Sequence, residues 1–173
     1  NNIQRIKKIF IIKQTLVKLK KEIKEKVIIR YDHKAYSRNK ILINKKLFGE
    51  EFTFDNCATQ LTNHLHNTKL VVHDSCSTGW LETIFFNIPT VIILDKKVEV
   101  FRKGFNKNLN ELIKCKVIHY SHDSLIEFIN KNYHEIDNWW NSNLVKESIH
   151  SLKKEYIKGS NDPINDLIKT LRK

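Results

Sequence analysis

The sequence predicts an α/β fold: a doubly wound parallel sheet with helices on both faces, followed by a helical C-terminal tail. The first observation behind this prediction is that short β-branched runs alternate with stretches of helical periodicity between residues 27 and 133. The second is that residues 134–173 keep helical periodicity and are interrupted only near 159–163. Alternating strands and helices favour parallel pairing through right-handed crossovers.

The elements follow one another in a simple order. Residues 3–25 combine an apolar face with a lysine-rich face at helical spacing, which predicts a long N-terminal helix. The β-branched runs predict strands near 27–31, 69–73, 90–94 and 116–120, with shorter candidates at 40–43 and 51–55. Helices are expected between them, at 57–66, 79–87, 109–114 and 123–132. Pro89 lies where the 90–94 strand begins, so residues 69–94 form the clearest strand–helix–strand unit.

The composition is typical of a folded globular domain. Of the 173 residues, 40% are hydrophobic and 29% are charged, and no apolar run reaches the roughly 18 residues of a membrane-spanning helix. The three cysteines, Cys57, Cys76 and Cys115, are widely spaced, which argues against a disulfide framework or a zinc site and favours the reducing cytoplasm. The chain contains no methionine, so we expect it to be part of a longer protein.

The formal net charge is +12, from 31 Lys and Arg residues against 19 Asp and Glu residues. One explanation is a lysine-rich surface without a specific partner. The other is an anionic partner: a sugar nucleotide, a lipid phosphate, an anionic membrane or a nucleic acid. Basic and aromatic residues do not alternate as they do on base-stacking surfaces, so we expect no nucleic-acid partner.

The most informative segment is the turn that follows the predicted strand 69–73 and opens the next helix. Ligands of open α/β sheets bind beyond the carboxyl ends of strands, where a helix start offers unpaired N–H groups and a favourable dipole to phosphate. Ser75, Ser77 and Thr78 would add hydroxyl donors, and Gly79 would let a ligand approach closely. Glu82 lies about 5–6 Å from Thr78 on one helix face, where its carboxylate could accept from ribose hydroxyls.

Plain N-capping explains the same turn without a ligand, because Ser77 and Thr78 are good residues for starting a helix. Cys76 lies at the helix start, which could lower its pKa, but no catalytic base accompanies it and we interpret it as a small filler residue. The histidines show no metal-ligand spacing, so we expect neither a metal nor another cofactor. Trp139 and Trp140 are interpreted as packing anchors of the tail helices in preference to a platform for an acceptor.

The spacing Ser77-Thr78-Gly79-x-x-Glu82, followed by Asn87-x-Pro89-Thr90, resembles the donor-binding motif of GT-B glycosyltransferases and related UDP-sugar 2-epimerases. It is especially similar to bacterial capsule and surface-polysaccharide transferases, whose pattern is Ser-Thr-x-Gly-x-Glu-Ala, a short helix and Gly-Lys-Pro. Residues 28–30 and 136–141 look like a narrower group, transferases of the LIC12162 type. The resemblance spans about residues 27–155 and is most specific over 70–94. The position of Gly79 directly after Thr78 departs from the pattern, as do Thr83 and Asn87, where Ala and Gly are common.

The resemblance implies the C-terminal, donor-binding half of a two-domain GT-B enzyme. Residues 1–26 would form an N-terminal helix, 27–133 a Rossmann-like domain for the nucleotide sugar, and 134–173 the helical tail. The N–H groups at Ser77 and Thr78 would hold the donor diphosphate, and Glu82 would hold the ribose.

The resemblance also brings basic residues into the predicted pocket. Arg30, at the end of the first strand, matches a strand end that often faces phosphate in this fold. The alternative is a surface Arg30 that pairs with Asp32. Arg102 and Lys103, which follow the 90–94 strand, are weaker candidates for the same pocket.

We therefore expect a glycosyltransferase domain that binds a nucleotide-sugar donor for surface polysaccharide or glycolipid synthesis. The acceptor would be a glycan or glycolipid. The domain would act in the cytoplasm, where it could also contact the inner face of the membrane peripherally. The helix start and cationic side chains would stabilise the leaving diphosphate without a metal. No catalytic base is assigned beyond the local candidates His33 and Asp74. We expect the isolated chain to bind a nucleotide weakly and to transfer no sugar. The alternative is a non-catalytic basic α/β module that docks on an anionic membrane or nucleic acid.

Overall fold

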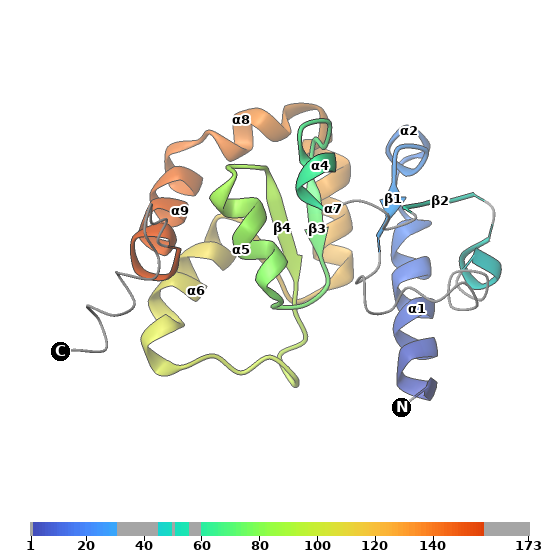
Figure 1. Ribbon diagram of the computed structural model, residues 1–173, viewed down its shortest axis with the longest axis horizontal. Helices are drawn as coiled ribbons and strands as arrows, with labels where there is room; N and C mark the ends of the chain where they lie inside the picture. Colours follow the sequence, from blue (N-terminus) through green and yellow to red (C-terminus); the bar gives the residue numbers. More distant parts are fainter. Residues whose placement is uncertain (1, 31–44, 50, 56–59, 158–173) are drawn as a thin grey trace.

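The structure is a computed structural model that describes residues 2–30, 45–49, 51–55 and 60–157 (Figure 1). The strands in this part of the chain are β1 Ile28–Ile29, β2 Thr53–Phe54, β3 Val71–His73, β4 Thr90–Ile93 and β5 Ile118–His119. The α-helices include α1 Asn2–Leu16, α2 Lys21–Lys24, α4 Thr62–Leu65, α5 Thr78–Phe85, α6 Asn106–Lys114, α7 His122–Asn132, α8 Ile136–Trp140 and α9 Asn143–Tyr156. The short 3-10 helices η2 Lys103–Phe105 and η3 Tyr133–Glu135 lead into α6 and α8.

The main sheet has the strand order β3-β4-β5, and both pairings are parallel, as the sequence predicts. Val72 pairs with Val91, and Ile92 pairs with Ile118. All four residues of the central strand β4 are buried, which explains its continuous run of threonine, valine and isoleucine. The predicted α/β class with parallel strands is confirmed, and residues 71–93 form the expected strand–helix–strand unit.

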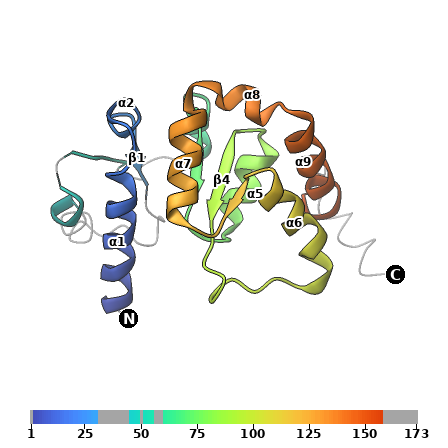
Figure 2. The same ribbon diagram turned by 180° about the vertical axis from the view of Figure 1, so that it is seen from behind.

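Side chains from β4 and its carboxyl end point alternately into two hydrophobic layers, one on each face of the main sheet. Ile92 and Leu94 pack with residues of α5, α6, α8 and α9. Val91 and Ile93 pack with α7, with Ile23 of α2 and with the start of α8. Figures 1 and 2 show this division from two sides: α5, α6 and α9 lie on one side of the strands, and α7 lies on the other. Helices therefore cover both faces of β4.

The helices after residue 134 complete the core of the main sheet. Trp140 of α8 and Val145, Ile149 and Leu152 of α9 are buried in the layer that α5 and α6 form. Asn87, just past the end of α5, is left-handed (φ 58°), a conformation that asparagine tolerates better than most residues, and its Oδ1 accepts from Trp140 Nε1 at 3.2 Å. The predicted break at 159–163 lies outside the described residues.

The first strand differs from its predicted place. We expected it in the same sheet as the other strands, but β1 pairs with β2 in a separate two-stranded parallel sheet. Ile29 packs there in a cluster with Phe48, Phe52 and Phe54. This cluster partly buries Ile29 although β1 does not join the main sheet. The predicted strand at 51–55 is confirmed as β2, whereas the candidate at 40–43 lies outside the described residues.

Polar contacts supplement the apolar packing of the N-terminal helices against α7. The Lys20 N–H donates to Asn130 Oδ1 at 2.9 Å. The Asn130 Nδ2 in turn donates to the Lys18 carbonyl at 3.1 Å. Lys18 Nζ also lies 2.6 Å from Asp123 Oδ1. Among the described helices, none combines the length and the apolar character that a membrane crossing requires.

Candidate functional site

The turn after β3 lies at the carboxyl edge of the main sheet, where the sequence predicts a ligand site. β3 ends at His73, and α5 begins at Thr78. Ser77 takes the N-cap position with an extended backbone (φ −89°, ψ 169°), but its hydroxyl caps no amide of α5. Both Ser77 and Thr78 are exposed. The first-turn N–H groups of α5 have no acceptor within the helix and are therefore open to a ligand.

Carboxylates contact this turn from two places. The Ser75 hydroxyl donates to Asp74 Oδ1 at 3.4 Å, and the Cys76 N–H donates to Glu99 Oε1 at 3.4 Å. Glu99 belongs to the segment after β4, so it reaches the turn across the edge of the sheet. Both distances are long for hydrogen bonds, which indicates weak contacts. The Cys76 amide thus already faces an anion, and a phosphate would compete with Glu99 for it.

Residues after β4 and β5 enter the same edge of the sheet. Lys96 Nζ lies 4.6 Å from the centre of the Tyr120 ring. Burial raises the pKa of the Tyr120 phenol, and the nearby Cys76 acts in the same direction. The roles of Lys96, Glu99 and Tyr120 at this edge were not predicted from the sequence. The available signal was their position after the predicted strands 90–94 and 116–120, because the carboxyl ends of neighbouring parallel strands meet at one edge.

Cys76 corrects one expectation. The helix start was expected to lower its pKa, but burial raises the pKa of this thiol to about 11, and Glu99 contributes in the same direction. The residue packs against the hydrophobic layer formed by α5 and α6. Because the thiol stays protonated at neutral pH, Cys76 supplies no thiolate nucleophile.

His73 and Thr83 connect the end of β3 to α5. The Thr83 hydroxyl donates to the Trp80 carbonyl at 2.9 Å, so it accepts from His73 Nε2 at 3.2 Å, which places the imidazole proton on Nε2. Burial lowers the pKa of His73, which keeps the ring neutral. A Cβ on Gly79 would lie 3.4 Å from His73 Cε1, an ordinary contact. Packing alone therefore does not require glycine at this position.

Glu82 occupies the second turn of α5 and is exposed. The first turn of α5 contains no acidic residue, so Glu82 does not serve as a capping acid for the helix start. Within the described part of the chain, no ion pair or hydrogen bond engages its carboxylate. The side chain is thus available to a ligand at the turn.

Arg30 follows β1 and belongs to the other sheet. Its guanidinium Nη1 pairs with Asp55 Oδ2, and both side chains are largely buried. The sequence suggested Asp32 as the partner of Arg30 if Arg30 did not contact phosphate, and it did not indicate Asp55. Asp32 and His33 both lie outside the described residues. The pairing with Asp55 follows the β1–β2 pairing, which the turn before α5 is not part of.

Arg102 and Lys103 are exposed at the start of η2, beyond the segment that carries Lys96 and Glu99. They therefore lie close in sequence to the segment that reaches the carboxyl edge of the main sheet. Neither residue contacts the turn before α5 through any described hydrogen bond or ion pair. The described residues contain no group of three or more His, Cys, Asp or Glu side chains arranged to hold a metal ion.

A family model described as LIC12162 family transferase matches residues 14–171. The chain belongs to this family. The match confirms the resemblance that residues 28–30 and 136–141 indicate in the sequence. No curated protein and no solved structure matches the chain.

Membership makes this LIC12162 protein a transferase, an enzyme with a donor that gives up a chemical group and an acceptor that receives it. The match extends beyond the span of about 27–155 that the motifs suggested, at both ends. It includes all three strands of the main sheet and the turn before α5. The candidate site therefore lies well inside the part of the chain that the family shares.

Proposed function

We propose that this LIC12162 transferase is a glycosyltransferase domain that binds a nucleotide-sugar donor at the turn before α5 and serves surface polysaccharide or glycolipid synthesis. The observation that carries the proposal is the open start of α5 at the carboxyl edge of the parallel sheet. Ser77 and Thr78 are exposed there, and the Ser77 hydroxyl caps no amide. Helix starts in this position attract phosphate through free N–H groups and the helix dipole.

Each residue of the turn takes one role in the proposal. The N–H groups of Ser77 and Thr78 bind the donor diphosphate, Gly79 leaves room for its approach, and the Ser75 hydroxyl adds a donor. Glu82 accepts from the ribose hydroxyls. The same N–H groups stabilise the charge that develops on the diphosphate as the sugar leaves for a glycan or glycolipid acceptor.

The surroundings of the turn bear on this role in two ways. Glu99 must leave the Cys76 amide when a diphosphate binds, because two anions at one amide repel each other. Lys96 lies at the same edge and supplies a compensating positive charge. Arg30 stays a predicted phosphate contact that would have to exchange Asp55 for the ligand. We assign donor binding to residues 27–133 as the C-terminal half of a GT-B enzyme that acts in the cytoplasm.

Replacing Glu82 with glutamine is expected to weaken nucleotide binding about tenfold or more. Two charge-assisted hydrogen bonds to vicinal hydroxyls contribute roughly 1.5–3 kcal/mol each before desolvation, and about 1.4 kcal/mol corresponds to a factor of ten. Glutamine has nearly the same shape and is a good helix former, so the fold should remain intact. Isothermal titration calorimetry with UDP, GDP, CDP and CMP measures the affinity, and thermal melts monitor the fold.

Glu147→Gln is the matched control, because Glu147 is an exposed glutamate on α9. This variant should change neither the affinity nor the Tm. If Glu82→Gln binds every nucleotide as tightly as the wild type, Glu82 does not contact the ribose. The donor-site proposal would then lose its main support at the level of a single residue.

The segment after β4 favours a membrane contact at the same edge, which we include in the proposal. Val98 and Val100 are 71% and 89% exposed. Exposed Lys96 and Lys97 precede them, and exposed Arg102 follows. Exposed apolar side chains between cations fit an anionic lipid surface, to which each nearby cation contributes about 1 kcal/mol. Such a contact would bring a lipid-linked acceptor close to the donor.

Replacing Val98 and Val100 together with aspartate is expected to reduce binding to vesicles that contain phosphatidylglycerol by about tenfold or more. The substitution removes two apolar contacts and adds two negative charges at the membrane surface. Co-sedimentation measures the binding, with phosphatidylcholine vesicles as the baseline. The matched control is the same double substitution with aspartate at Ile11 and Val17, which lie in and just after α1 and are 46% and 43% exposed. An equal loss of binding in both double variants would mean that general charge, and not this segment, attracts the membrane.

A further inference from the structure

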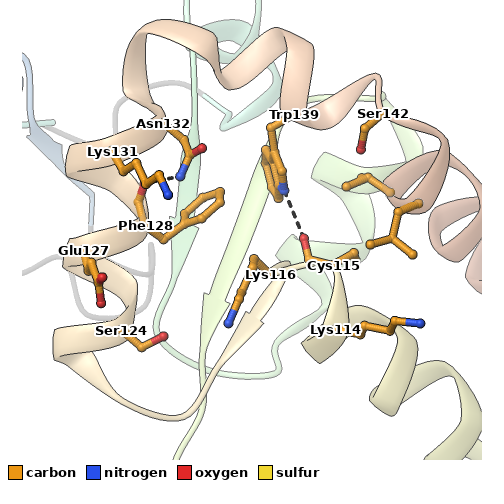
Figure 3. Close-up of a pocket in the computed structure, with 12 residues that line it drawn as sticks. Lys114, Cys115, Lys116, Ser124, Glu127, Phe128, Lys131, Asn132, Trp139 and Ser142 are labelled. Carbon is orange, nitrogen blue, oxygen red and sulfur yellow. Dashed lines mark hydrogen bonds between the residues drawn. The ribbon is translucent and has the colours of Figure 1, made fainter.

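A pocket lies near the residues that lead into β5, at the end of the main sheet opposite the α5 turn. Its volume is about 390 Å³, and it lies between the end of α6, α7, α8 and the start of α9 (Figure 3). The side chains that matter for its chemistry are Lys114, Lys116, Glu127, Phe128, Lys131 and Trp139. Because Lys114 and Lys116 precede β5, this pocket is distinct from the α5 turn at the carboxyl edge.

The charge around the pocket is positive. Three lysines line it, Lys114, Lys116 and Lys131, against one carboxylate, Glu127. Figure 3 shows that they come from different elements: Lys131 from α7, Lys114 from the end of α6, and Lys116 from the turn that follows. None of these three ammonium groups is in an ion pair within the described part of the chain. The pocket is therefore suited to an anion.

Lys116 stands where a helix end normally has glycine. The Lys116 N–H donates to the Ile113 carbonyl at 3.1 Å, and the Val117 N–H donates to the Leu112 carbonyl at 2.9 Å. These two bonds form a Schellman motif, whose left-handed position favours glycine because a Cβ is strained there. Lys116 occupies this position with φ 66°. Because the Lys116 side chain is exposed, no packing contact offsets this local backbone strain. The left-handed lysine therefore points to a use for its side chain.

Two side chains hold the backbone of this turn in place. Trp139 Nε1 donates to the Cys115 carbonyl at 2.9 Å, and His119 Nε2 donates to the Lys116 carbonyl at 2.9 Å. Both carbonyls are thereby satisfied, so the fold holds the backbone from which the Lys116 side chain extends toward the pocket.

The start of α9 adds a second feature that favours an anion. Ser142 and two residues in the first turn of α9, Leu144 and Val145, line the pocket. Ser142 is the N-cap residue, and its hydroxyl caps no amide of this 14-residue helix. The first-turn N–H groups therefore supplement the positive charge of the lysines.

The aromatic side chains give the pocket an apolar side. The rings of Phe128 and Trp139 meet edge to face, with centroids 4.8 Å apart and an angle of 66°. Trp139 is half-buried and stands in the middle of the pocket in Figure 3, whereas Trp140 is buried. An indole beside cations fits a ligand that combines an apolar ring face with a negative charge. A pyranose ring with its C–H groups on one face has this combination when it carries an anionic group.

We propose that this pocket binds an anionic sugar, a hexose that carries a phosphate or a carboxylate. The anionic group contacts Lys116 and Lys131, and the sugar ring packs against Trp139. The proposal rests on the pocket alone and does not depend on the donor site at the α5 turn.

The indole N–H signal of Trp139 in a nitrogen-labelled chain reports binding, and Trp139→Phe assigns it. We expect glucose 1-phosphate and glucuronate to shift this signal to saturation. Glucose, which has no charge, and inorganic phosphate, which has no ring, should bind at least tenfold more weakly. Glu82→Gln should leave these affinities unchanged, so failure of the donor proposal and failure of this one are distinguishable.

Lys116→Gly tests the cation at the left-handed position. It relieves the left-handed strain and is expected to raise the Tm while weakening glucose 1-phosphate binding at least fivefold. Lys97→Gly, an exposed lysine of the segment after β4, is the control and should leave the affinity unchanged. The proposal is overturned if no sugar shifts the Trp139 signal, if phosphate binds as well as the sugar phosphate, or if Lys116→Gly binds like the wild type.

Discussion

Replacing Trp140 with alanine is expected to lower the free energy of unfolding by about 3–5 kcal/mol. Trp140 is 4% exposed and joins α8 to the hydrophobic layer that contains Trp80, Ile84 and Ile149. Its removal opens a cavity among side chains from three helices, and these helices can close the space only in part. Urea unfolding followed by circular dichroism measures the change.

Trp140→Phe separates packing from hydrogen bonding. Phenylalanine keeps most of the buried ring but loses the bond from Nε1 to Asn87 Oδ1. Because Asn87 is exposed, water can satisfy its amide, and the expected loss is about 1–2 kcal/mol. An alanine variant within about 1 kcal/mol of the wild type would contradict the packing of α8 on α5. The C-terminal helices would then be independent of the core.

The main sheet was predictable because its signals are local. The runs at 69–73 and 90–94 are β-branched, the segment between them has helical spacing, and Pro89 marks the start of the second strand. A parallel pair joined by one helix follows from these features with few alternatives. β5 was found in the same way, although only Ile118–His119 of the predicted 116–120 form the strand.

The place of β1 was not predictable from such signals. Its two residues pair with two residues about 25 positions away, and the choice depends on an aromatic cluster that Phe48, Phe52 and Phe54 build with Ile29. The ion pair between Arg30 and Asp55 strengthens the same pairing. Nothing in the local pattern of residues 27–31 distinguishes this sheet from the main one, because a short apolar run suits either.

The candidate site was likewise predictable only where its residues are consecutive in the sequence. The α5 turn was found because strand end, hydroxyl residues and helix start are consecutive in the sequence. Glu99 and Tyr120 were missed because their approach to the turn depends on which strands are neighbours. The raised pKa of Cys76 depends on burial, which is a property of the tertiary fold. Trp139 packs against both hydrophobic layers as predicted, and its indole also lines a pocket that the sequence did not indicate.

Acidification from pH 7 to pH 4 is expected to lower the free energy of unfolding by about 3 kcal/mol through His119 alone. The ring is 3% exposed, its Nδ1 lies 3.1 Å from Ser124 Oγ, and its Nε2 donates to the Lys116 carbonyl at 2.9 Å. Burial lowers the pKa of His119 from 6.5 to about 4. Between these two values the unfolded chain binds a proton that the folded chain does not. Stability is therefore fully present above pH 6.5 and is lost as the pH falls toward 4.

His119→Gln tests this assignment, because glutamine is polar but does not titrate. The variant should be less stable than the wild type at pH 7, yet its unfolding free energy should fall less steeply between pH 6.5 and pH 4. His150→Gln, at an exposed position of α9, should keep the wild-type pH profile. Urea unfolding at a series of pH values measures all three. Equal slopes for the wild type and His119→Gln would mean that the folded chain does not exclude the proton from this ring.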